Sequence, residues 1–272
     1  MMEMIDEYLS FANLLADQAR TILSDYSRPQ GFEFKSDQSP VTEADKRIEE
    51  RLRAMIGERY PGHGFLGEET AGQSLDAELV WIVDPIDGTK AFISGMPVFS
   101  TLIALAQNGR PKLGLMDFPA LSIRFSGAKG RPTLKNGAPC RARKAPLGVV
   151  MAVSNPEALN LEDRRGVREL RKMASFAVYG GSSLIYANLA LGLIDLCVDG
   201  GLDAYDYCPL APIVEGAGGR ITDWSGEPLS ISSGSRVLAA GDPSLHQKAL
   251  EALSAAQVAM ALEGPLLDGP PW

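Results

Sequence analysis

Hydrophobic residues in the N-terminal part of the chain recur at helical spacing. Between residues 4 and 26, apolar side chains stand three or four positions apart, and this period predicts an amphipathic helix. Residues 27–40 are mostly polar and predict a loop. Beyond them, Thr42 precedes Asp45 by the spacing of a capping box, and apolar residues at helical spacing follow. The sequence therefore predicts a second helix that begins just after Thr42.

The middle of the chain alternates short apolar segments with turn residues. Asn108-Gly109 stands between two such segments and is a strong signal for a tight β-hairpin. Asn136-Gly137 predicts another turn. The predicted strands are residues 79–83, 100–107, 112–118 and 123–126. We therefore expect residues 79–140 to form an antiparallel meander rather than repeated βαβ units.

The C-terminal part predicts a mixture of helices and strands. The predicted helices are residues 162–174, 183–191, 207–216 and 243–261. The predicted strands are residues 149–153, 176–179, 193–199, 221–222 and 237–240. This alternation is typical of a mixed α/β domain. We expect one domain in two intimate halves, about 1–145 and 146–262, which meet near Ala145-Pro146, and a tail of turn residues at 263–272.

The composition narrows the possible functions. Of the 272 residues, 45% are hydrophobic, which is enough to build a sizeable core. The 26 basic and 34 acidic side chains give a net charge of −8. This charge argues against generic binding to nucleic acids or to anionic membranes, because such binding requires a basic face. It is compatible with a small anionic substrate if bound cations screen the acidic groups.

Histidine and cysteine are scarce. The two histidines, His63 and His246, lack the spacing of a zinc site. The three cysteines form no Cys-x-x-Cys pair, which fits reduced thiols in the cytoplasm. The N-terminal sequence lacks the features of a signal peptide, and the most apolar stretch, 184–198, is too short and too polar to cross a bilayer. We therefore expect a soluble cytoplasmic protein.

The densest chemical signal is Trp-Ile-Val-Asp-Pro-Ile-Asp-Gly-Thr at 81–89. The carboxylates of Asp84 and Asp87 and the carbonyl of Ile86 could converge on one hard cation, since Mg²⁺ and Ca²⁺ prefer oxygen ligands. If a helix begins at Gly88-Thr89, its free amides face the same space and could bind a phosphate. The alternative is a strand-to-helix turn in which the acidic groups serve only as caps.

Three further acidic groups are weak signals when taken singly. Glu68 and Glu69 could be a solvated pair on a loop. Asp45 could be only the acidic member of the capping box with Thr42. Asp206 could be the N-cap of the helix that ends at Gly216. Their value as signals lies in their combination.

Four motifs, in this order along the chain, resemble the signature of the inositol monophosphatase family. They are Pro-Val-Thr-Glu-Ala-Asp at 40–45, Leu-Gly-Glu-Glu at 66–69, the motif at 81–89, and Tyr205-Asp206 leading to Glu-Gly-Ala-Gly-Gly at 215–219. Within this family, the residues at 84–97 and 205–210 resemble the bacterial histidinol-phosphatase branch more than the inositol enzymes. The resemblance implies a layered α-β-α-β-α sandwich of the inositol monophosphatase and sugar phosphatase type, usually as a homodimer.

The resemblance also implies a role for each acidic group. By this resemblance, two or three Mg²⁺ ions would be bound by Glu68, Asp84, the Ile86 carbonyl, Asp87 and Asp206. Thr89 and Asp45 would position and deprotonate the attacking water, and Glu69 would complete the catalytic group. The amides of Gly88 and Thr89, beside Asp87, would bind the phosphate. Such a site needs carboxylates, a hydroxyl and amides but no histidine, because divalent cations offset the phosphate charge.

The positions that would select the substrate depart from the histidinol-phosphatase pattern. By resemblance, Gly180, Gly181, Ser182 and Asp199 would contact the substrate. Histidinol phosphatases usually carry Asp at the position of Ser182 and Glu at that of Asp199. A missing carboxylate would weaken the recognition of a cationic amino alcohol, and Asp199 is one methylene shorter than Glu. The alternative for Ser182 and Ser183 is an N-cap pair at the start of a helix.

Lys35, in the polar segment before Asp45, has two interpretations. By the resemblance, a lysine at this place in the sequence of family members helps to hold the loop of the metal site. The alternative is a solvated surface charge.

These residues favour a Mg²⁺-dependent phosphomonoesterase. L-Histidinol phosphate is the first expected substrate, inositol monophosphate the second, and 3′-phosphoadenosine 5′-phosphate the third. A regulatory protein that binds the transcription machinery is the alternative from another class. The complete set of acidic groups argues against a purely binding role, and the acidic surface argues against direct contact with RNA.

Overall fold

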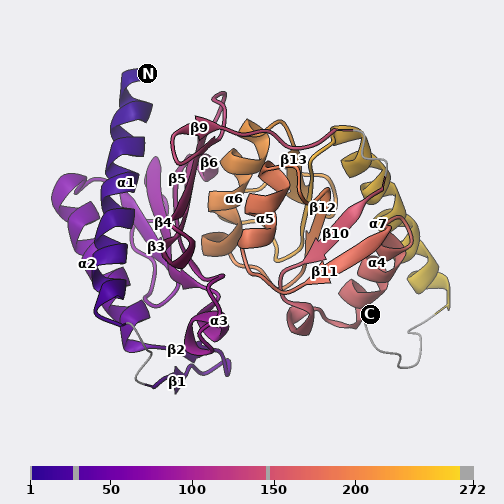
Figure 1. Ribbon diagram of the computed structural model, residues 1–272, viewed down its shortest axis with the longest axis horizontal. Helices are drawn as coiled ribbons and strands as arrows, with labels where there is room; N and C mark the ends of the chain where they lie inside the picture. Colours follow the sequence, from indigo (N-terminus) through magenta and orange to yellow (C-terminus); the bar gives the residue numbers. More distant parts are fainter. Residues whose placement is uncertain (1, 27–30, 145–147, 264–272) are drawn as a thin grey trace.

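Two β-sheets, with helices between them and on their outer faces, form the frame of the protein (Figure 1). The structure is a computed structural model that describes residues 2–26, 31–144 and 148–263. The predicted seam at Ala145-Pro146 lies outside the described residues. So does the predicted tail, apart from Glu263, which ends the last helix.

The first sheet is the predicted meander with one strand added at its edge. Its strands, in spatial order, are β3 (Gly64–Gly67), β4 (Leu79–Asp87), β5 (Ser100–Gln107), β6 (Arg110–Phe118), β7 (Ile123–Ala128), β8 (Leu134–Lys135) and β9 (Ala138–Pro139). All neighbours from β4 to β9 are antiparallel, and β3 pairs with β4 in parallel. The hairpin at Asn108-Gly109 and the turn at Asn136-Gly137 are confirmed, and all four residues have positive φ.

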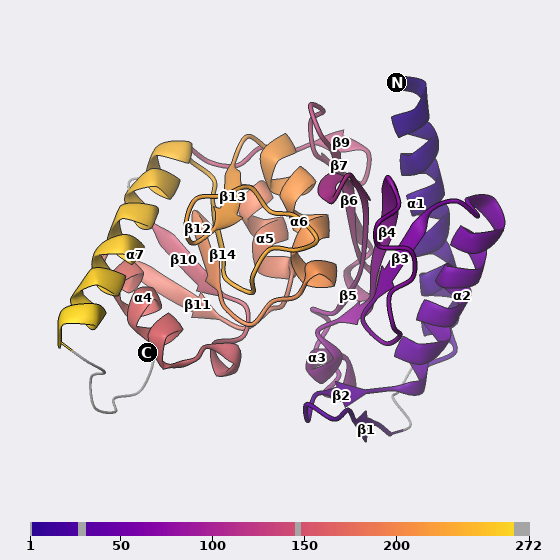
Figure 2. The ribbon, with the colours of Figure 1, turned by 180° about the vertical axis from the view of Figure 1, so that it is seen from behind.

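Helices α1 (Met2–Ser24) and α2 (Glu43–Arg59) cover the outer face of the first sheet, as both views show (Figures 1 and 2). Their apolar faces bury Leu15, Ile48 and Leu52 against Trp81 and Ile103 of the sheet. The predicted capping box of α2 is confirmed, with Thr42 as the N-cap. The segment predicted as a loop contains the short hairpin β1 (Glu33–Phe34) and β2 (Pro40–Val41).

The second sheet is mixed. Its spatial order is β11 (Phe176–Tyr179), β10 (Val150–Val153), β12 (Leu196–Asp199), β14 (Val237–Ala240) and β13 (Arg220–Asp223). Strand β10 is parallel to β11 and β12, whereas β14 is antiparallel to β12 and β13. Helices α4 (Leu161–Arg171) and α7 (Pro243–Glu263) cover its outer face (Figures 1 and 2).

Helices α5 (Leu184–Ala190) and α6 (Ala204–Gly216) lie between the two sheets. One core cluster runs from strands of the first sheet through both helices to the second sheet. The layers therefore alternate α-β-α-β-α, and the expected fold class is confirmed. Three short elements complete the described chain: α3 (Thr89–Ile93), η1 (Pro119–Leu121) and η2 (Pro156–Ala158).

Helix α6 approaches the first sheet unusually closely. A Cβ atom added at Gly114 of β6 would lie 2.0 Å from the Pro209 carbonyl oxygen, and one at Gly127 of β7 would lie 2.7 Å from that of Pro212. Only glycine permits this contact, because any side chain would push the helix outward. The close approach matters for function because α6 carries Asp206 over the end of the first sheet.

Among the described residues, no helix is both long and apolar enough to cross a membrane.

Candidate metal centre

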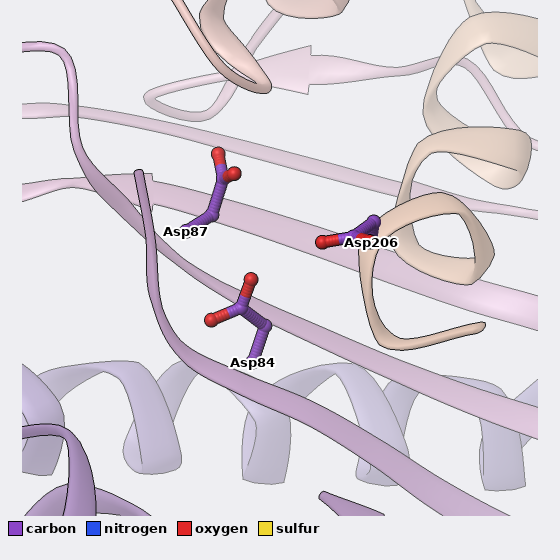
Figure 3. Close-up of side chains that lie close together, drawn as sticks. All are labelled: Asp84, Asp87 and Asp206. Carbon is purple, nitrogen blue, oxygen red and sulfur yellow. The ribbon is translucent and has the colours of Figure 1, made fainter. Parts of the chain in front are cut away.

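Three aspartates from two distant parts of the chain meet between the first sheet and α6. One carboxylate oxygen from each of Asp84, Asp87 and Asp206 lies within 4.8 Å of the other two. Figure 3 shows the three side chains around a common space, two of them from β4 and one from the first turn of α6. The structure therefore brings together three of the predicted metal-ligating carboxylates.

A bulge in β4 explains why two residues three positions apart face the same space. In a regular strand, residues i and i+3 point to opposite faces of the sheet. Here the register with β5 shifts between Asp84 and Asp87, which re-aims the second side chain. Thr101 on β5 donates a hydrogen bond from Oγ1 to the Pro85 carbonyl oxygen (2.9 Å) and so stabilises the bulge. The predicted strand ends at Val83, whereas β4 continues through the bulge to Asp87.

Asp206 occupies the third position of α6 rather than its N-cap. The alternative interpretation of Asp206 as the N-cap is wrong, because α6 begins at Ala204 and Asp203 is its N-cap. The backbone N–H of Asp203 donates to Asp206 Oδ2 (2.7 Å), as in a capping box. The spacing of Asp203 and Asp206 in the sequence was the signal for this arrangement. The capping box orients the Asp206 carboxylate at the start of the helix.

The three carboxylates repel one another in a buried environment. Burial raises the pKa of Asp84 well above its usual range, and the negative charges of Glu68, Asp87 and Asp206 raise it further. Burial is also the largest cause of the raised pKa values of Asp87 and Asp206. Among the described residues, none donates a hydrogen bond to the buried Oδ1 atom of Asp84. A buried carboxylate oxygen without a donor is costly, and a divalent cation would satisfy it.

The set of donor atoms fits magnesium. It consists of the carboxylate oxygens of the three aspartates. The Ile86 carbonyl as a further ligand stays a prediction. A hard cation such as Mg²⁺ prefers oxygen ligands over nitrogen or sulfur. We therefore conclude that Asp84, Asp87 and Asp206 could hold such an ion.

Glu68 and Glu69 directly follow β3, and both side chains form ion pairs with Lys35. Lys35 Nζ donates to Glu68 Oε1 (2.7 Å) and to Glu69 Oε1 (2.8 Å). Burial lowers the pKa of Lys35, but these hydrogen bonds outweigh that effect and leave the pKa above its usual range. Burial raises the pKa of Glu69 to about 7. Lys35 thus holds the acidic loop, and the alternative of a solvated surface charge is wrong.

Glu68 lies next to the three-aspartate cluster without joining it. Its oxygens are not among those that lie within 4.8 Å of one another. Its negative charge nevertheless raises the pKa values of Asp84, Asp87 and Asp206. Its role as a metal ligand stays a prediction.

Thr89 and Asp45 lie side by side, as predicted. Thr89 Oγ1 donates to the Ile86 carbonyl oxygen (3.1 Å) and lies 3.5 Å from Asp45 Oδ1. The other oxygen of Asp45, Oδ2, accepts from the N–H (2.8 Å) and from the hydroxyl (2.5 Å) of Thr42. The capping box therefore occupies one carboxylate oxygen and leaves the other facing Thr89. Burial raises the pKa of Asp45 to about 6.

Gly88, the next-to-last residue of the motif at 81–89, has a left-handed backbone conformation. Its φ angle is +82°, and it is the N-cap of the five-residue helix α3, so the predicted helix start at Gly88-Thr89 is confirmed. Binding of phosphate by the Gly88 and Thr89 amides stays a prediction.

The turn that follows β11 touches the motif at 81–89. Gly180, Gly181 and Ser182 have φ angles of +89°, +103° and +48°. After this turn, the Ser183 N–H donates to Asp87 Oδ2 (2.8 Å). Ser183 is the N-cap of α5 but makes no side-chain capping bond, and its hydroxyl lies 2.8 Å from that of Ser100. Of the two serines considered as N-caps, only Ser183 is at the N-cap position. The turn before it packs against Asp87 of the metal site.

Asp199 is turned into the protein interior. It is the last residue of β12 and is 1% exposed. Its Oδ1 accepts from the Ser154 N–H (2.8 Å) and its Oδ2 from the Tyr186 hydroxyl (2.7 Å). Burial raises its pKa to about 6. Both carboxylate oxygens are thus engaged, and contact between Asp199 and a substrate stays a prediction.

Two residues of the site region were not anticipated. Glu49 is a buried carboxylate on α2 that holds the acidic loop, and Tyr186 is the buried donor to Asp199. The position of Glu49, one helical turn after Asp45, was a signal in the sequence. The pairing of Tyr186 with Asp199 depends on how α5 packs on β12 and has no local signal.

Known proteins resemble the chain over most of its length. Residues 4–258 match the model of the inositol monophosphatase family. The chain is 38% identical over 262 residues to the bifunctional phosphatase IMPL2, chloroplastic, of Arabidopsis thaliana, covering 92% of this chain and 75% of that protein. It is 34% identical to the histidinol-phosphatase of Mycobacterium tuberculosis, covering 82% and 88%.

A solved structure shows the same fold. An inositol monophosphatase from Zymomonas mobilis superposes with a TM-score of 0.83 and 38% identity, covering 92% of this chain and 98% of that one. The acidic site lies within the matched residues. The chain therefore belongs to the inositol monophosphatase family and is a phosphoric monoester hydrolase.

Proposed function

We propose that this enzyme hydrolyses L-histidinol phosphate to L-histidinol and inorganic phosphate with the help of two or three Mg²⁺ ions. The observation that carries the proposal is the meeting of Asp84, Asp87 and Asp206 beside Thr89 and Asp45. Glu68 and the Ile86 carbonyl would complete the ligands. Relatives named as histidinol-phosphatases support the substrate.

The side chains have distinct tasks in the proposed reaction. Bound Mg²⁺ would supply the positive charge that offsets the phosphate and favours deprotonation of the attacking water. Asp45, with a pKa of about 6, is ionised at neutral pH, and its Oδ1 would accept the Thr89 hydroxyl proton in place of the Ile86 carbonyl oxygen, which would bind Mg²⁺. The Thr89 oxygen is then free to accept a hydrogen bond from the water and to orient it. As the water oxygen bonds to phosphorus, a water proton would pass to Thr89 Oγ1 while the Thr89 proton passes to Asp45. The ester P–O bond breaks, and the leaving alkoxide takes up a proton from solvent water.

The second candidate substrate is inositol monophosphate. Other relatives are named inositol-1-monophosphatases, at 30% and 31% identity. Ser182 is neutral, and both Asp199 oxygens are engaged, so neither offers a free carboxylate to an ammonium group. These features are the reason that a hydroxyl-rich substrate is the second candidate. 3′-Phosphoadenosine 5′-phosphate is the third candidate.

The decisive experiment measures phosphate release from these three substrates at equal concentration with Mg²⁺. A preference of a hundredfold or more for L-histidinol phosphate, about 2.7 kcal/mol of transition-state discrimination, is the expected result. A flat profile, or a preference for inositol 1-phosphate, would move the assignment to the second candidate.

The metal assignment has its own control. We expect Asp84→Asn and Asp87→Asn to abolish Mg²⁺-dependent release from every substrate, whereas Asp76→Asn, at an exposed position, retains it. Full activity in either of the first two variants would overturn the assignment.

We also propose a cytoplasmic homodimer that binds neither nucleic acid nor membranes. The resemblance to the family supports the dimer, and three cysteines without disulfide partners fit a reducing compartment. Light scattering would give twice the chain mass of 29.1 kDa for a dimer. Stoichiometric recovery of RNA polymerase in a pull-down would instead favour the regulatory alternative.

A further inference from the structure

Glu49 is a fully buried acid that belongs to none of the motifs assigned above. It lies on α2 with 0% of its surface exposed. Its Oε2 accepts from the Glu69 N–H (2.8 Å) and its Oε1 from the Thr70 hydroxyl (2.6 Å). Both carboxylate oxygens therefore bind the loop that carries Glu68 and Glu69.

The loop is shaped to receive this carboxylate. A Cβ atom added at Gly67 would lie 2.4 Å from Cδ and 2.5 Å from both oxygens of Glu49. Only glycine at position 67 leaves space for the carboxylate. Glu49 thus sets the position of the backbone on both sides of Glu68.

Arg53 extends the contact by one further helical turn. Its Nη1 donates to the Thr70 hydroxyl oxygen (2.7 Å), and its Nη2 donates to Gln73 Oε1 (3.0 Å). The Thr70 hydroxyl accepts from Arg53 and donates to Glu49, so the three groups form one continuous chain of hydrogen bonds.

The same face of α2 also holds the Thr89 side of the site. Asp45 lies one turn before Glu49, and residues four apart share a helix face. Asp45 contacts Thr89, whereas Glu49 contacts the loop of Glu68. A single rigid helix therefore sets the distance between the residues that orient the water and the predicted ligand Glu68.

We propose that Glu49 is a positioning residue for the metal centre, which holds residues 67–70 so that the Glu68 carboxylate can bind a divalent cation. The proposal rests on the metal-dependent function above, because it assigns Glu49 a task only if Glu68 is a ligand. Glu49 does not touch the reacting atoms.

The test measures metal binding directly, with Mn²⁺ and the whole metal-free protein in a calorimeter. Glu49→Gln keeps the shape of the side chain but cannot accept from both loop donors. We expect it to weaken Mn²⁺ binding 10- to 100-fold, the range typical of residues that support a metal ligand. Glu50→Gln, at the exposed neighbouring position, is the matched control and keeps the wild-type affinity.

A double-mutant cycle tests the route of the effect. Glu68→Gln removes the predicted ligand itself. If Glu49 acts through Glu68, then Glu49→Gln adds less than a twofold further weakening in the Glu68→Gln background. Independent, fully additive losses would overturn the proposal.

Thermal unfolding of the metal-free proteins separates positioning from stability. We expect Glu49→Gln to unfold within a few degrees of the wild type, and excess Mg²⁺ to restore its kcat. Should Glu49→Gln fail to fold, Thr70→Val removes one of the two loop donors and leaves the carboxylate charge; a three- to tenfold weaker Mn²⁺ affinity supports the proposal, and wild-type affinity overturns it.

The outcomes distinguish this proposal from the function on which it rests. A wild-type protein that binds no divalent cation overturns the metal-dependent function and the proposal with it. A wild-type protein that binds Mn²⁺ while Glu49→Gln binds it equally well overturns the positioning role alone.

Discussion

The two sides of the active site are built in different ways. On the side of the first sheet, functional groups come from neighbouring positions of single elements: Asp84 and Asp87 on one bulged strand, Asp45 and Glu49 on one helix face. On the side of the second sheet, Ser182 and Asp199 come from a turn and a strand end, and the Asp199 carboxylate is engaged in the interior. The metal side therefore depends on local backbone geometry for all of its groups except Asp206, which α6 brings in, and the predicted substrate side depends on packing between elements.

This difference explains how the substrate side can change while the metal side is retained. Replacing a side chain at position 182 leaves the bulge of β4 and the cap of α2 intact. The two departures from the histidinol-phosphatase pattern both fall on the substrate side, and all the predicted metal ligands are present in the sequence.

Hydrogen bonds connect the sides. The Ser183 N–H donates to the carboxylate oxygen Asp87 Oδ2 (2.8 Å), and the Ser183 hydroxyl lies 2.8 Å from that of Ser100 on β5. Lys90 of α3 also pairs with Glu157 of η2 (2.9 Å), but their side chains are 65% and 76% exposed. Such an exposed ion pair contributes little to stability, because water and salt screen the two charges.

The largest expected effect lies on the metal side. Thr89→Val removes the hydroxyl that contacts Asp45 and should lower kcat by about 10²- to 10⁴-fold, the range for a lost acid–base contact. Steady-state kinetics with saturating Mg²⁺ measures this loss. Thr89→Ser retains the hydroxyl and should stay within about tenfold of the wild type, and an equal loss in both variants would argue against the hydroxyl as the active group.

A smaller loss is expected where the two sides meet. A Cβ atom at Gly88 would lie 2.5 Å from Ser182 Oγ, in a residue with φ of +82°. Gly88→Ala should therefore displace the turn and lower kcat/KM by about 10²-fold, as expected for a shift of about 1 Å. Gly95→Ala is the matched control, because Gly95 has φ of +73° but nothing within 4 Å of the added atom. Equal losses would assign the effect to backbone strain alone.

On the substrate side, Asp199 should make stability depend on pH. Its pKa rises on folding from 3.8 to about 6, so its contribution is complete below about pH 4 and is lost as pH rises through 6. The loss amounts to roughly 2–3 kcal/mol. Asp199→Asn lacks this titration but can still accept from Ser154 and donate to Tyr186.

Denaturant unfolding at several pH values checks this expectation. The difference in unfolding free energy, wild type minus Asp199→Asn, should fall between pH 4 and pH 7. Asp76→Asn, at an exposed position, controls for the loss of a charge as such. A difference that stays constant with pH would show that burial does not raise the pKa of Asp199.

The smallest effect is expected on substrate choice. Ser182→Asp introduces a carboxylate that can pair with an ammonium group, and aspartate tolerates the left-handed φ of +48° at this position. We expect the ratio of kcat/KM for L-histidinol phosphate to that for inositol 1-phosphate to rise about tenfold, or 1.4 kcal/mol. Ser182→Asn has the same shape without the charge and should leave the ratio unchanged. A fall in the ratio would place the amine of the substrate elsewhere.

The sequence by itself determined the elements and the local geometry of the metal side. The capping box at Thr42 and Asp45, the hairpin at Asn108-Gly109 and the helix start at Gly88 are all present in the structure. Each of them depends on residues only a few positions apart, whose preferred backbone angles and hydrogen bonds are local properties.

Only the tertiary structure decided how distant groups meet. Asp87 and Ser183 are 96 positions apart, and Lys35 reaches Glu68 across 33. Three further features were not predicted from the sequence. They are the exact start of α6, the burial of the Asp199 carboxylate and the contact of Glu49 with the acidic loop. Each depends on how helices pack against sheets, and on glycines such as Gly114 that let two backbones approach closely. Hydrophobic periodicity tells which face of an element is buried, but not which other element it packs against.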